Sequence, residues 1–429
     1  MISVKQIRDR NFCLCIVGMG RIGLPMAVSF ASKGVRVIGV EKNEKIIQML
    51  KDGKALFFEE GLSEALASST GSGKLTFVSD ADCDYTGCQI IIVAIGTPLK
   101  ENLMPNMSLI QDVVSEISRK ASADSVVILR STLVPGTTTN KILPQINKSS
   151  SRLRVAVCPE RIVEGQALVE IARLPEIIGV EDEYTGSIVR ELFLLLGQKQ
   201  ISITNTKTAE AAKLFTNVYR YVNFALSNEF ALICENLNID ARETIHLANL
   251  GYSRSNIPLP GPAAGPCLRK DGLFLSNVSS INLIKVAWLL NESIPLHIVE
   301  TIENKLGNLH GRKVGVLGKA YKKNIDDVRD SPAVRLIEEL ESRGAEVLSF
   351  DPHIPSPNTM DEVLESEILI LAVNHSYFDQ LDANKLRQTK LVYDVWGQLS
   401  GLNVSAKGTK YISLGGGIWS PQESIMAKF

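Results

Sequence analysis

A cysteine in a loop rich in glycine and proline carries the first chemical signal of the sequence. In the segment GPAAGPCLRKDG (261–272), Cys267 lies three residues before Lys270 and four before Asp271. A neighbouring ammonium group favours the thiolate, which is the reactive form of the side chain. Cysteines outside disulfides are also common as small buried residues. The residues alone leave the nucleophile and the buried thiol equally open.

Two other pairs of polar side chains are spaced four residues apart. Lys213 and Asn217 would share one face of a helix, where a cation and an amide donor can stabilise a developing oxyanion. A solvated helix face is the commoner explanation of such a pair. Glu160 and Glu164, in CPERIVEG (158–165), would share a face of a helical turn and could provide a water-activating base with a supporting partner. Solvated surface acids explain this second pair equally well.

A glycine motif predicts a phosphate-binding turn near the N-terminus. The segment GMGRIG (18–23) matches GxGxxG, in which the glycines permit a tight turn, close approach of a pyrophosphate and close packing of helix on strand. It follows an apolar run, opens a helix-compatible stretch, and is followed by Glu41 at the end of the next predicted strand, where an acid binds ribose. An acid there favours NAD over NADP, because it would repel a 2′-phosphate. A simple packing turn is the alternative.

Short apolar runs predict the strands that must position these residues. Five runs in the first part of the chain are separated by helical segments and lie at 12–18, 35–41, 89–96, 125–131 and 153–159. The same order returns in four later runs, at 312–318, 345–352, 367–375 and 391–397. The predicted fold class is therefore α/β, with two Rossmann-like doubly wound parallel-sheet domains joined by a long central helix. Thr97 and Thr132 follow two of these strands, at the sheet edge where such folds bind ligands. Ordinary loop residues explain each of the two motifs equally well.

The middle of the chain differs from both ends. Residues 207–239 repeat apolar positions at helical spacing, which predicts one long helix, and we expect one face of it to pack against another subunit. Residues 253–267 then form a long irregular loop, a feature that is more often functional than incidental. We expect three domains, at residues 1–206, 207–305 and 306–429.

Composition excludes several classes of protein. The 46 basic and 47 acidic residues give a net charge of −1, which argues against a nucleic-acid partner. The N-terminus lacks the order of a secretory signal, and the sequence has no apolar run of about 18 residues, so membrane insertion is not expected. The seven cysteines show no metal-ligand spacing, so we expect no metal site and a cytoplasmic location.

Eight segments in order resemble the UDP-glucose/GDP-mannose dehydrogenase family, the nucleotide-sugar 6-dehydrogenases. They are GMGRIG, AIGTP, STLVPGTT, PERIVEG, AEAAKLFTNVYRYVNFALSNE, GPCLRKD, GKAYKKNIDDVRDSPA and DVWG. The resemblance implies an NAD-dependent, four-electron oxidation of the C6 alcohol of a UDP-sugar to a carboxylate. It also implies that the second Rossmann-like domain binds UDP and that the long helix forms a homodimer.

The resemblance assigns roles to individual residues. Cys267 matches the nucleophile, which forms a thiohemiacetal and then a thioester. The other matches to catalytic residues are Lys213 and Asn217 at the oxyanion, Asp271 and Thr132 at a water, and Glu164 as the base. Substrate contacts are implied for Glu160, Arg161, Arg254 and Lys322. Cofactor contacts are implied for Gly18, Gly20, Arg21, Ile22, Gly23, Glu41, Thr97, Thr132, Lys270 and Arg329.

The sequence departs from the family pattern at three places. Two alanines stand in the loop before Cys267, where the family carries more glycines; Glu41 replaces the commoner aspartate; and DVWGQ lacks the arginine common in UDP-glucose enzymes. The last feature, together with PERIVEG and GPCLRKD, resembles the N-acetylhexosamine branch of the family. It favours UDP-N-acetyl-D-mannosamine, oxidised to a uronic acid for cell-surface polysaccharide, with UDP-glucose and UDP-N-acetylglucosamine as competing substrates.

Two alternatives come from other classes. Another NAD enzyme with a helical middle, such as a 3-hydroxy-acid or phosphogluconate dehydrogenase, explains residues 1–250 but not GPCLRKD or the second Rossmann-like domain. A non-catalytic nucleotide-sugar-binding protein would keep the fold, but the intact set of candidate catalytic residues argues against it.

Overall fold

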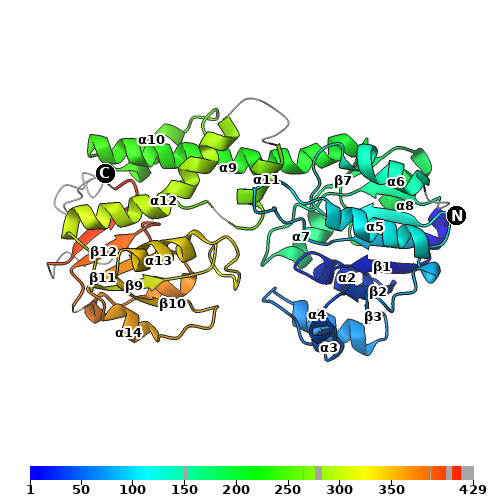
Figure 1. Cartoon of the computed structure of the whole chain (residues 1–429), viewed down its shortest axis with the longest axis horizontal. Coiled ribbons are helices and arrows are strands. Elements are labelled where there is room, and N and C mark those ends of the chain that lie inside the picture. Colours follow the sequence, from blue (N-terminus) through cyan, green and yellow to red (C-terminus); the bar gives the residue numbers. More distant parts are fainter. Residues whose placement is uncertain (149–151, 264, 276–282, 387, 402–407, 417–429) are drawn as a thin grey trace. The chain divides into compact units, whose positions relative to one another are not determined.

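The computed structural model describes residues 1–148, 152–263, 265–275, 283–386, 388–401 and 408–416. The chain forms two compact units, Met1–Thr216 and Asn217–Phe429, and each contains a sheet with helices packed against it (Figure 1). Within the described ranges, no helix is long and apolar enough to cross a membrane.

The sheet of the first unit has the strand order β3-β2-β1-β4-β5-β6-β7-β8. Its neighbouring strands are parallel except for β6 and β7, a departure from the all-parallel expectation. The order reverses between β1 and β4, which is the switch point where such sheets bind ligands. The strands are β1 (Cys13–Val17), β2 (Arg36–Glu41), β3 (Leu75–Ser79), β4 (Ile90–Val93), β5 (Val126–Leu129), β6 (Arg154–Val157), β7 (Glu176–Val180) and β8 (Ile201–Thr204).

The five strands predicted in this unit are all present, whereas β3, β7 and β8 were not predicted. The central strands β1, β4 and β5 are buried along their whole length, so they appear in the sequence as continuous apolar runs. In β3 and β8 some side chains face solvent, so LTFVS and ISIT contain no such run. The helices of this unit are α1 (Val4–Arg8), α2 (Gly23–Ser32), α3 (Glu44–Lys51), α4 (Leu62–Gly71), α5 (Ser108–Lys120), α6 (Leu143–Lys148), α7 (Ala167–Arg173) and α8 (Glu183–Leu194).

The second unit contains a parallel sheet with the order β10-β9-β11-β12-β13. Its strands are β9 (Lys313–Leu317), β10 (Glu346–Phe350), β11 (Ile368–Leu371), β12 (Leu391–Asp394) and β13 (Lys410–Ser413). The first four confirm the four predicted runs, and β13 was not predicted. The associated helices are α10 (Ala241–Asn249), α11 (Leu268–Leu275), α12 (Leu283–Leu306), α13 (Pro332–Ser342) and α14 (Met360–Leu364).

The long helix predicted over residues 207–239 is α9 (Thr206–Leu237). The chain leaves the helix where Asn238 adopts a left-handed conformation with φ of 57°. The side chain of Asp240 then caps α10 by accepting from the backbone N–H of Glu243. A polar, turn-forming segment therefore ends the helix close to the predicted position.

The two sheets share the same construction at their switch points. The N–H of Gly18 donates to Val40 O and that of Gly318 to Phe350 O, both at 2.8 Å. The N–H of Ala94 donates to Val17 O at 2.8 Å, and that of Ala372 to Leu317 O at 2.9 Å. Both glycines have positive φ, 95° and 91°, at the turn after the first strand of each sheet. The prediction of two Rossmann-like domains is confirmed.

Candidate functional site

The GMGRIG turn (18–23) forms a cradle of the kind that holds a pyrophosphate. A Cβ atom on Gly23 would lie 1.8 Å from Gly18 O, so α2 begins in close contact with the turn. A Cβ atom on Gly20 would meet nothing within 4 Å, so the turn is open at this residue. Only glycine therefore fits at Gly23, and the backbone at Gly20 can be approached closely by a ligand.

Glu41 lies beside this turn, at the end of β2. Its Oε2 accepts from the N–H of Met19 at 3.1 Å, and its Oε1 accepts from the N–H groups of Lys42 and Asn43 at 2.9 and 3.1 Å. These bonds fix the carboxylate at the rim of the cradle. An acid at this place accepts from ribose hydroxyls, so the residues of the turn and Glu41 together fit an NAD molecule.

The ends of β4 and β5 are joined at the same edge of the sheet. The hydroxyl of Ser131 donates to Ile95 O at 2.7 Å, which ties the segment carrying Thr132 to the segment carrying Thr97. Thr97 is buried and Thr132 is half-buried. Both predicted ligand residues therefore lie at the carboxyl end of the sheet, on neighbouring strands.

Glu160 is buried and bonded by protein groups on both oxygens. Its Oε2 accepts from Arg130 Nε at 2.7 Å, and its Oε1 accepts from the N–H groups of Arg161 and Ile162 at 2.6 and 2.8 Å. Burial raises the pKa of Glu160, but the Arg130 charge and the two N–H groups outweigh burial and hold the pKa below its usual value. Glu160 is therefore a fixed carboxylate.

Arg130 connects Glu160 to a second buried acid. Its guanidinium also donates to Glu176 and, at 3.1 Å, to Cys158 O. Lys199 Nζ donates to Glu176 Oε2 at 2.9 Å, so two cations and two carboxylates alternate in the interior. We did not single out Glu176 and Lys199 from the sequence, because neither lies in a recognisable motif.

The expectation that Glu160 and Glu164 share a face of a helical turn is wrong. Residues 158–163 are irregular, and the chain turns at Gly165, where φ is 88°. Glu164 forms an ion pair with Arg21 of the GMGRIG turn, with 3.8 Å between Oε2 and Nη1. The two glutamates thus have different partners: Glu160 is held in the interior, and Glu164 lies beside the predicted cofactor turn. Arg161 donates to Pro175 O.

Lys213 and Asn217 both lie on α9 and both are buried, which excludes the solvated-face explanation. The amide of Asn217 donates to Asp271 Oδ2 at 2.6 Å. Asp271 is completely buried, and its N–H donates to Cys267 O at 2.9 Å. The second unit therefore brings Asn217, Asp271 and Cys267 together.

Cys267 is exposed, whereas the other six cysteines are buried. It directly precedes α11, and the N-terminal end of a helix favours a negative charge. Lys270 lies in the first turn of this helix, with its ammonium 5.7 Å from the centre of the Phe274 ring. The buried-thiol interpretation is therefore wrong for Cys267.

The cysteine loop (253–267) is held by close contacts at two glycines. A Cβ atom on Gly261 would lie 2.4 Å from the Trp396 ring, and one on Gly265, where φ is 97°, would lie 2.6 Å from the Tyr321 ring. The Asn228 side chain also bonds both backbone groups of Gly261, at 2.9 and 3.1 Å. Of the two alanines that depart from the family pattern, Ala263 is buried and Ala264 lies outside the described residues.

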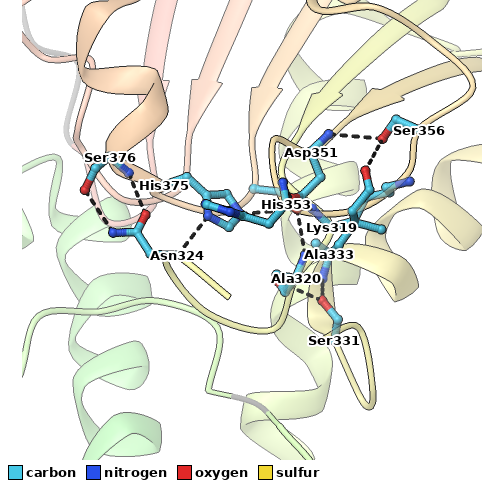
Figure 2. Close-up of polar contacts among 12 residues, drawn as sticks. Lys319, Ala320, Asn324, Ser331, Ala333, Asp351, His353, Ser356, His375 and Ser376 are labelled. Carbon is cyan, nitrogen blue, oxygen red and sulfur yellow. Dashed lines mark hydrogen bonds and ion pairs between the residues drawn. The ribbon is translucent and has the colours of Figure 1, made fainter. Parts of the chain in front are cut away.

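Arg254 and the two remaining predicted residues also lie in the second unit. Arg254 stacks on Tyr252 at 4.7 Å and lines a surface cavity of about 420 Å³. Lys322 is half-buried in the loop after β9. Arg329, seven residues further on, pairs with Asp327 at 2.6 Å. Figure 2 shows the polar contacts at the base of this loop, which involve Asp351 and His375.

The fold and the site together define a nucleotide-dependent dehydrogenase. The features that define it are the two Rossmann-like sheets, the glycine turn with an acid at the end of β2, and the exposed cysteine in front of a helix. The chain belongs to the UDP-glucose/GDP-mannose dehydrogenase family. The family's NAD binding domain matches residues 12–196, its central domain matches residues 207–292, and its UDP binding domain matches residues 315–401. The protein is an NAD-dependent nucleotide-sugar dehydrogenase.

Its relatives include enzymes named for two different sugars. The UDP-N-acetyl-D-mannosamine dehydrogenase of Methanocaldococcus jannaschii is 32% identical over 420 residues, covering 94% of this chain and 96% of that protein. The solved structure of the UDP-D-ManNAc dehydrogenase of Pyrococcus horikoshii has a TM-score of 0.89 at 29% identity and covers 95% of this chain and 100% of that chain. The solved structure of a UDP-glucose dehydrogenase from Pyrobaculum islandicum has a TM-score of 0.85 at 27% identity, and it covers 95% of this chain and 98% of that chain.

Proposed function

We propose that the protein oxidises the C6 alcohol of UDP-N-acetyl-D-mannosamine to a carboxylate, with two NAD reduced per sugar. The observation that carries the proposal is the exposed Cys267, set before α11 and next to the bonded pair Asn217 and Asp271. The choice of sugar is supported by the relatives named for it and by DVWGQ, which lacks the arginine common in UDP-glucose enzymes.

The catalytic thiol overcomes a specific difficulty of this reaction. The first oxidation yields an aldehyde, whose carbon must become tetrahedral before it can lose a second hydride. The Cys267 thiolate adds to that carbon and forms a thiohemiacetal, whose oxidation gives a thioester. Lys213 and Asn217 stabilise the negative oxygen that develops during the addition. NAD supplies the hydride acceptor in both oxidations.

Water then cleaves the thioester and releases the Cys267 thiolate. Asp271 and Thr132 orient the water, and Glu164 accepts its proton. The bond from Asn217 to Asp271 fixes the orientation of the amide, which leaves its second N–H available for the oxyanion. Lys213, Asn217 and Asp271 are buried, an arrangement that limits their reorganisation during the reaction.

Substrate and cofactor contacts follow the division of the chain. We assign NAD to residues 1–206, dimerisation and the cysteine loop to 207–305, and the UDP moiety to 306–429, with Arg161, Arg254 and Lys322 contacting the sugar nucleotide. Lys270 and Arg329 would contact the cofactor. Both oxygens of Glu160 are already bonded within the protein, which favours a role in holding its loop over direct contact with substrate.

We also propose a homodimer formed through α9. Exposed apolar side chains recur along this helix at Tyr219, Leu226, Ile233 and Leu237, a spacing that places them on one side. A cytoplasmic location and a product used for cell-surface polysaccharide complete the proposal. The location is supported by the cysteines, which form no disulfide and all fall in the described ranges.

The test supplies the purified protein with NAD and each sugar nucleotide in turn. We expect two NADH per molecule of UDP-N-acetyl-mannosaminuronic acid, and loss of this product in Cys267→Ser by more than about a thousandfold, because the nucleophile is removed. Cys83→Ser, which changes a buried thiol, should leave turnover unchanged.

Other outcomes would support the alternatives. Strong turnover of UDP-glucose alone would replace the proposed sugar, an alternative supported by the Pyrobaculum islandicum structure. Strong turnover of UDP-N-acetylglucosamine alone would likewise replace the proposed sugar. One NADH per substrate would indicate a simple alcohol dehydrogenase. Normal nucleotide-sugar binding with no oxidation, unchanged by Cys267→Ala, would indicate a binding protein.

A further inference from the structure

A buried aspartate and histidine lie in contact at the carboxyl end of the second sheet. Asp351 follows β10 and His375 follows β11, and their exposed fractions are 2% and 0%. His375 Nε2 lies 3.2 Å from Asp351 Oδ2 (Figure 2). Neither residue belongs to the catalytic set assigned above. A fully buried pair of this kind needs a structural or functional reason, because burying polar groups is costly unless they are bonded.

The bonds of His375 define its protonation state. Its Nδ1 lies 2.9 Å from the backbone N of Asn324. A backbone N–H can only donate, so Nδ1 accepts and the ring proton is on Nε2, which donates to Asp351. His375 is therefore neutral, with one defined tautomer.

Asp351 is the charged partner. Burial raises the pKa of Asp351, but the bond from His375 and the N–H groups of Lys319 and His353 outweigh burial and bring the pKa to about 2. Its Oδ2 accepts from the N–H groups of Lys319 and Ala320 at 2.6 and 3.0 Å. The aspartate thus fastens the beginning of the loop that follows β9.

The histidine fastens the other end of the same loop. Besides its N–H bond to His375, Asn324 accepts from the N–H of Ser376 at 3.0 Å and donates to the Ser376 hydroxyl at 3.1 Å. The lysine loop (319–324) is therefore anchored at both ends by one Asp–His pair. Between the anchors lie Tyr321, Lys322 and Lys323.

The first unit places a smaller residue where His375 lies. Thr97 follows Ala94 by three residues, as His375 follows Ala372, and the two alanines make equivalent bonds to the first strand of each sheet. In the second unit, a ring at this position reaches across to Asp351, the counterpart of Glu41 at the end of the second strand. At the switch point of the second sheet, the residues after β10 and β11 therefore bond the lysine loop of the same sheet.

We propose that His375 is a positioning residue for nucleotide-sugar binding: through its bond to the Asn324 N–H, it holds Lys322 in place to contact the sugar nucleotide. The proposal rests on the proposed assignment of the UDP moiety to residues 306–429. Removing the bond leaves this end of the lysine loop held only by the two bonds between Asn324 and Ser376. Substrate binding must then order the weakened loop, which lowers affinity.

Two substitutions of similar shape each preserve one of the two hydrogen bonds of His375 and remove the other. In His375→Asn, the side-chain oxygen can replace Nδ1 as the acceptor for Asn324, whereas in His375→Gln the amide N–H can replace Nε2 as the donor to Asp351. His375→Ala removes both bonds. His353→Ala is the matched control, because the His353 ring lies 4.9 Å from that of His375, while its bond to Asp351 comes from the backbone and survives the substitution.

The experiment measures UDP and NAD binding to the full-length protein by calorimetry. We expect UDP affinity to fall by about tenfold or more in His375→Ala and His375→Gln, and to stay within about threefold of wild type in His375→Asn. NAD affinity should be the same as in wild type in all the His375 variants. The His353→Ala variant should bind UDP as tightly as wild type. The comparison of Asn with Gln remains decisive if the alanine variant does not fold.

Two results would overturn the proposal. One is unchanged UDP affinity in both His375→Ala and His375→Gln. The other is a parallel loss of UDP and NAD affinity, with Asn no better than Gln, which would indicate a general structural role. If wild-type protein does not bind UDP, the proposed UDP assignment fails, and hydrogen exchange at residues 321–323 then tests His375: unchanged exchange in His375→Gln would refute its role in holding the loop.

Discussion

Arg130 is a single buried residue that positions part of the candidate site without belonging to it. It lies under the carboxyl end of the first sheet and binds two carboxylates that are distant in sequence, Glu160 and Glu176. Through Glu160 it fixes the backbone at Arg161 and Ile162, in the segment that leads to Glu164. The proposed base is thus placed by a residue that does not touch it.

Replacing Arg130 should therefore be costly. In Arg130→Met, Glu160 is left buried beside Glu176 without its guanidinium partner, and we expect the free energy of unfolding to fall by about 3–5 kcal/mol. Denaturant unfolding measures the change. Lys385→Ala, which removes an exposed ion pair with Asp361, is the control and should not shift the midpoint. A loss within the error of the control would show that the buried pair contributes nothing.

The pKa of Asp351 makes a prediction about acid stability. Its value is about 2 in the folded protein and 3.8 in the absence of structure, so the carboxylate stabilises the fold above pH 4. This contribution, about 2 kcal/mol, is lost as the pH falls from 4 to 2. Unfolding measured at pH 5 and at pH 2 should show a smaller acid-induced loss in Asp351→Asn than in wild type. An equal loss in both proteins would contradict the assignment.

At the scale of elements, the cysteine loop depends on aromatic side chains from other segments. Trp396 follows β12 and lies against Gly261, while Tyr321 belongs to the lysine loop and lies against Gly265. Trp396 is itself held by a bond from its indole N–H to Ala372 O at 2.8 Å. The loop that delivers Cys267 is therefore shaped by the carboxyl ends of the second sheet.

Adding a methyl group at Gly265 should displace this loop. In Gly265→Ala the new Cβ would lie 2.6 Å from the Tyr321 ring, at a φ of 97° that alanine rarely adopts. We expect a changed rate of alkylation of Cys267 by iodoacetamide and a marked loss of turnover. Gly401→Ala, where a Cβ would meet nothing within 4 Å, is the control. Wild-type alkylation and turnover in Gly265→Ala would show that the contact is not needed.

At the scale of the whole molecule, the apolar residues of α9 predict the state of assembly. Leu226→Arg places a charge among exposed apolar side chains that we propose to be buried between two subunits. We expect light scattering to show a dimer for wild type and a monomer for this variant. Val169→Arg changes an equally exposed apolar residue on α7 and should remain dimeric. A monomeric wild type would refute the proposed interface.

The two-sheet plan of the molecule was largely predictable. Nine strands were predicted and found. Strands such as β1, β4, β5, β11 and β12 are buried along their whole length and so carry continuous apolar runs. Strands β3 and β8 mix apolar and polar residues, and so were missed. The turn at residues 18–23 and Glu41 were recognisable because their function depends on neighbouring residues and on one spacing along the chain.

The arrangement of the site could not be predicted without the tertiary structure, because its key contacts join residues far apart in sequence. Local sequence indicated that Cys267, Lys213 and Asn217 could do chemistry, but not that the pair on α9 is buried or that Asn217 bonds Asp271. A four-residue spacing suggested one face for Glu160 and Glu164, whereas the fold gives them Arg130 and Arg21 as separate partners. Spacing determines neighbours only where the chain is regular. In loops, partners are set by which strand ends the sheet brings together.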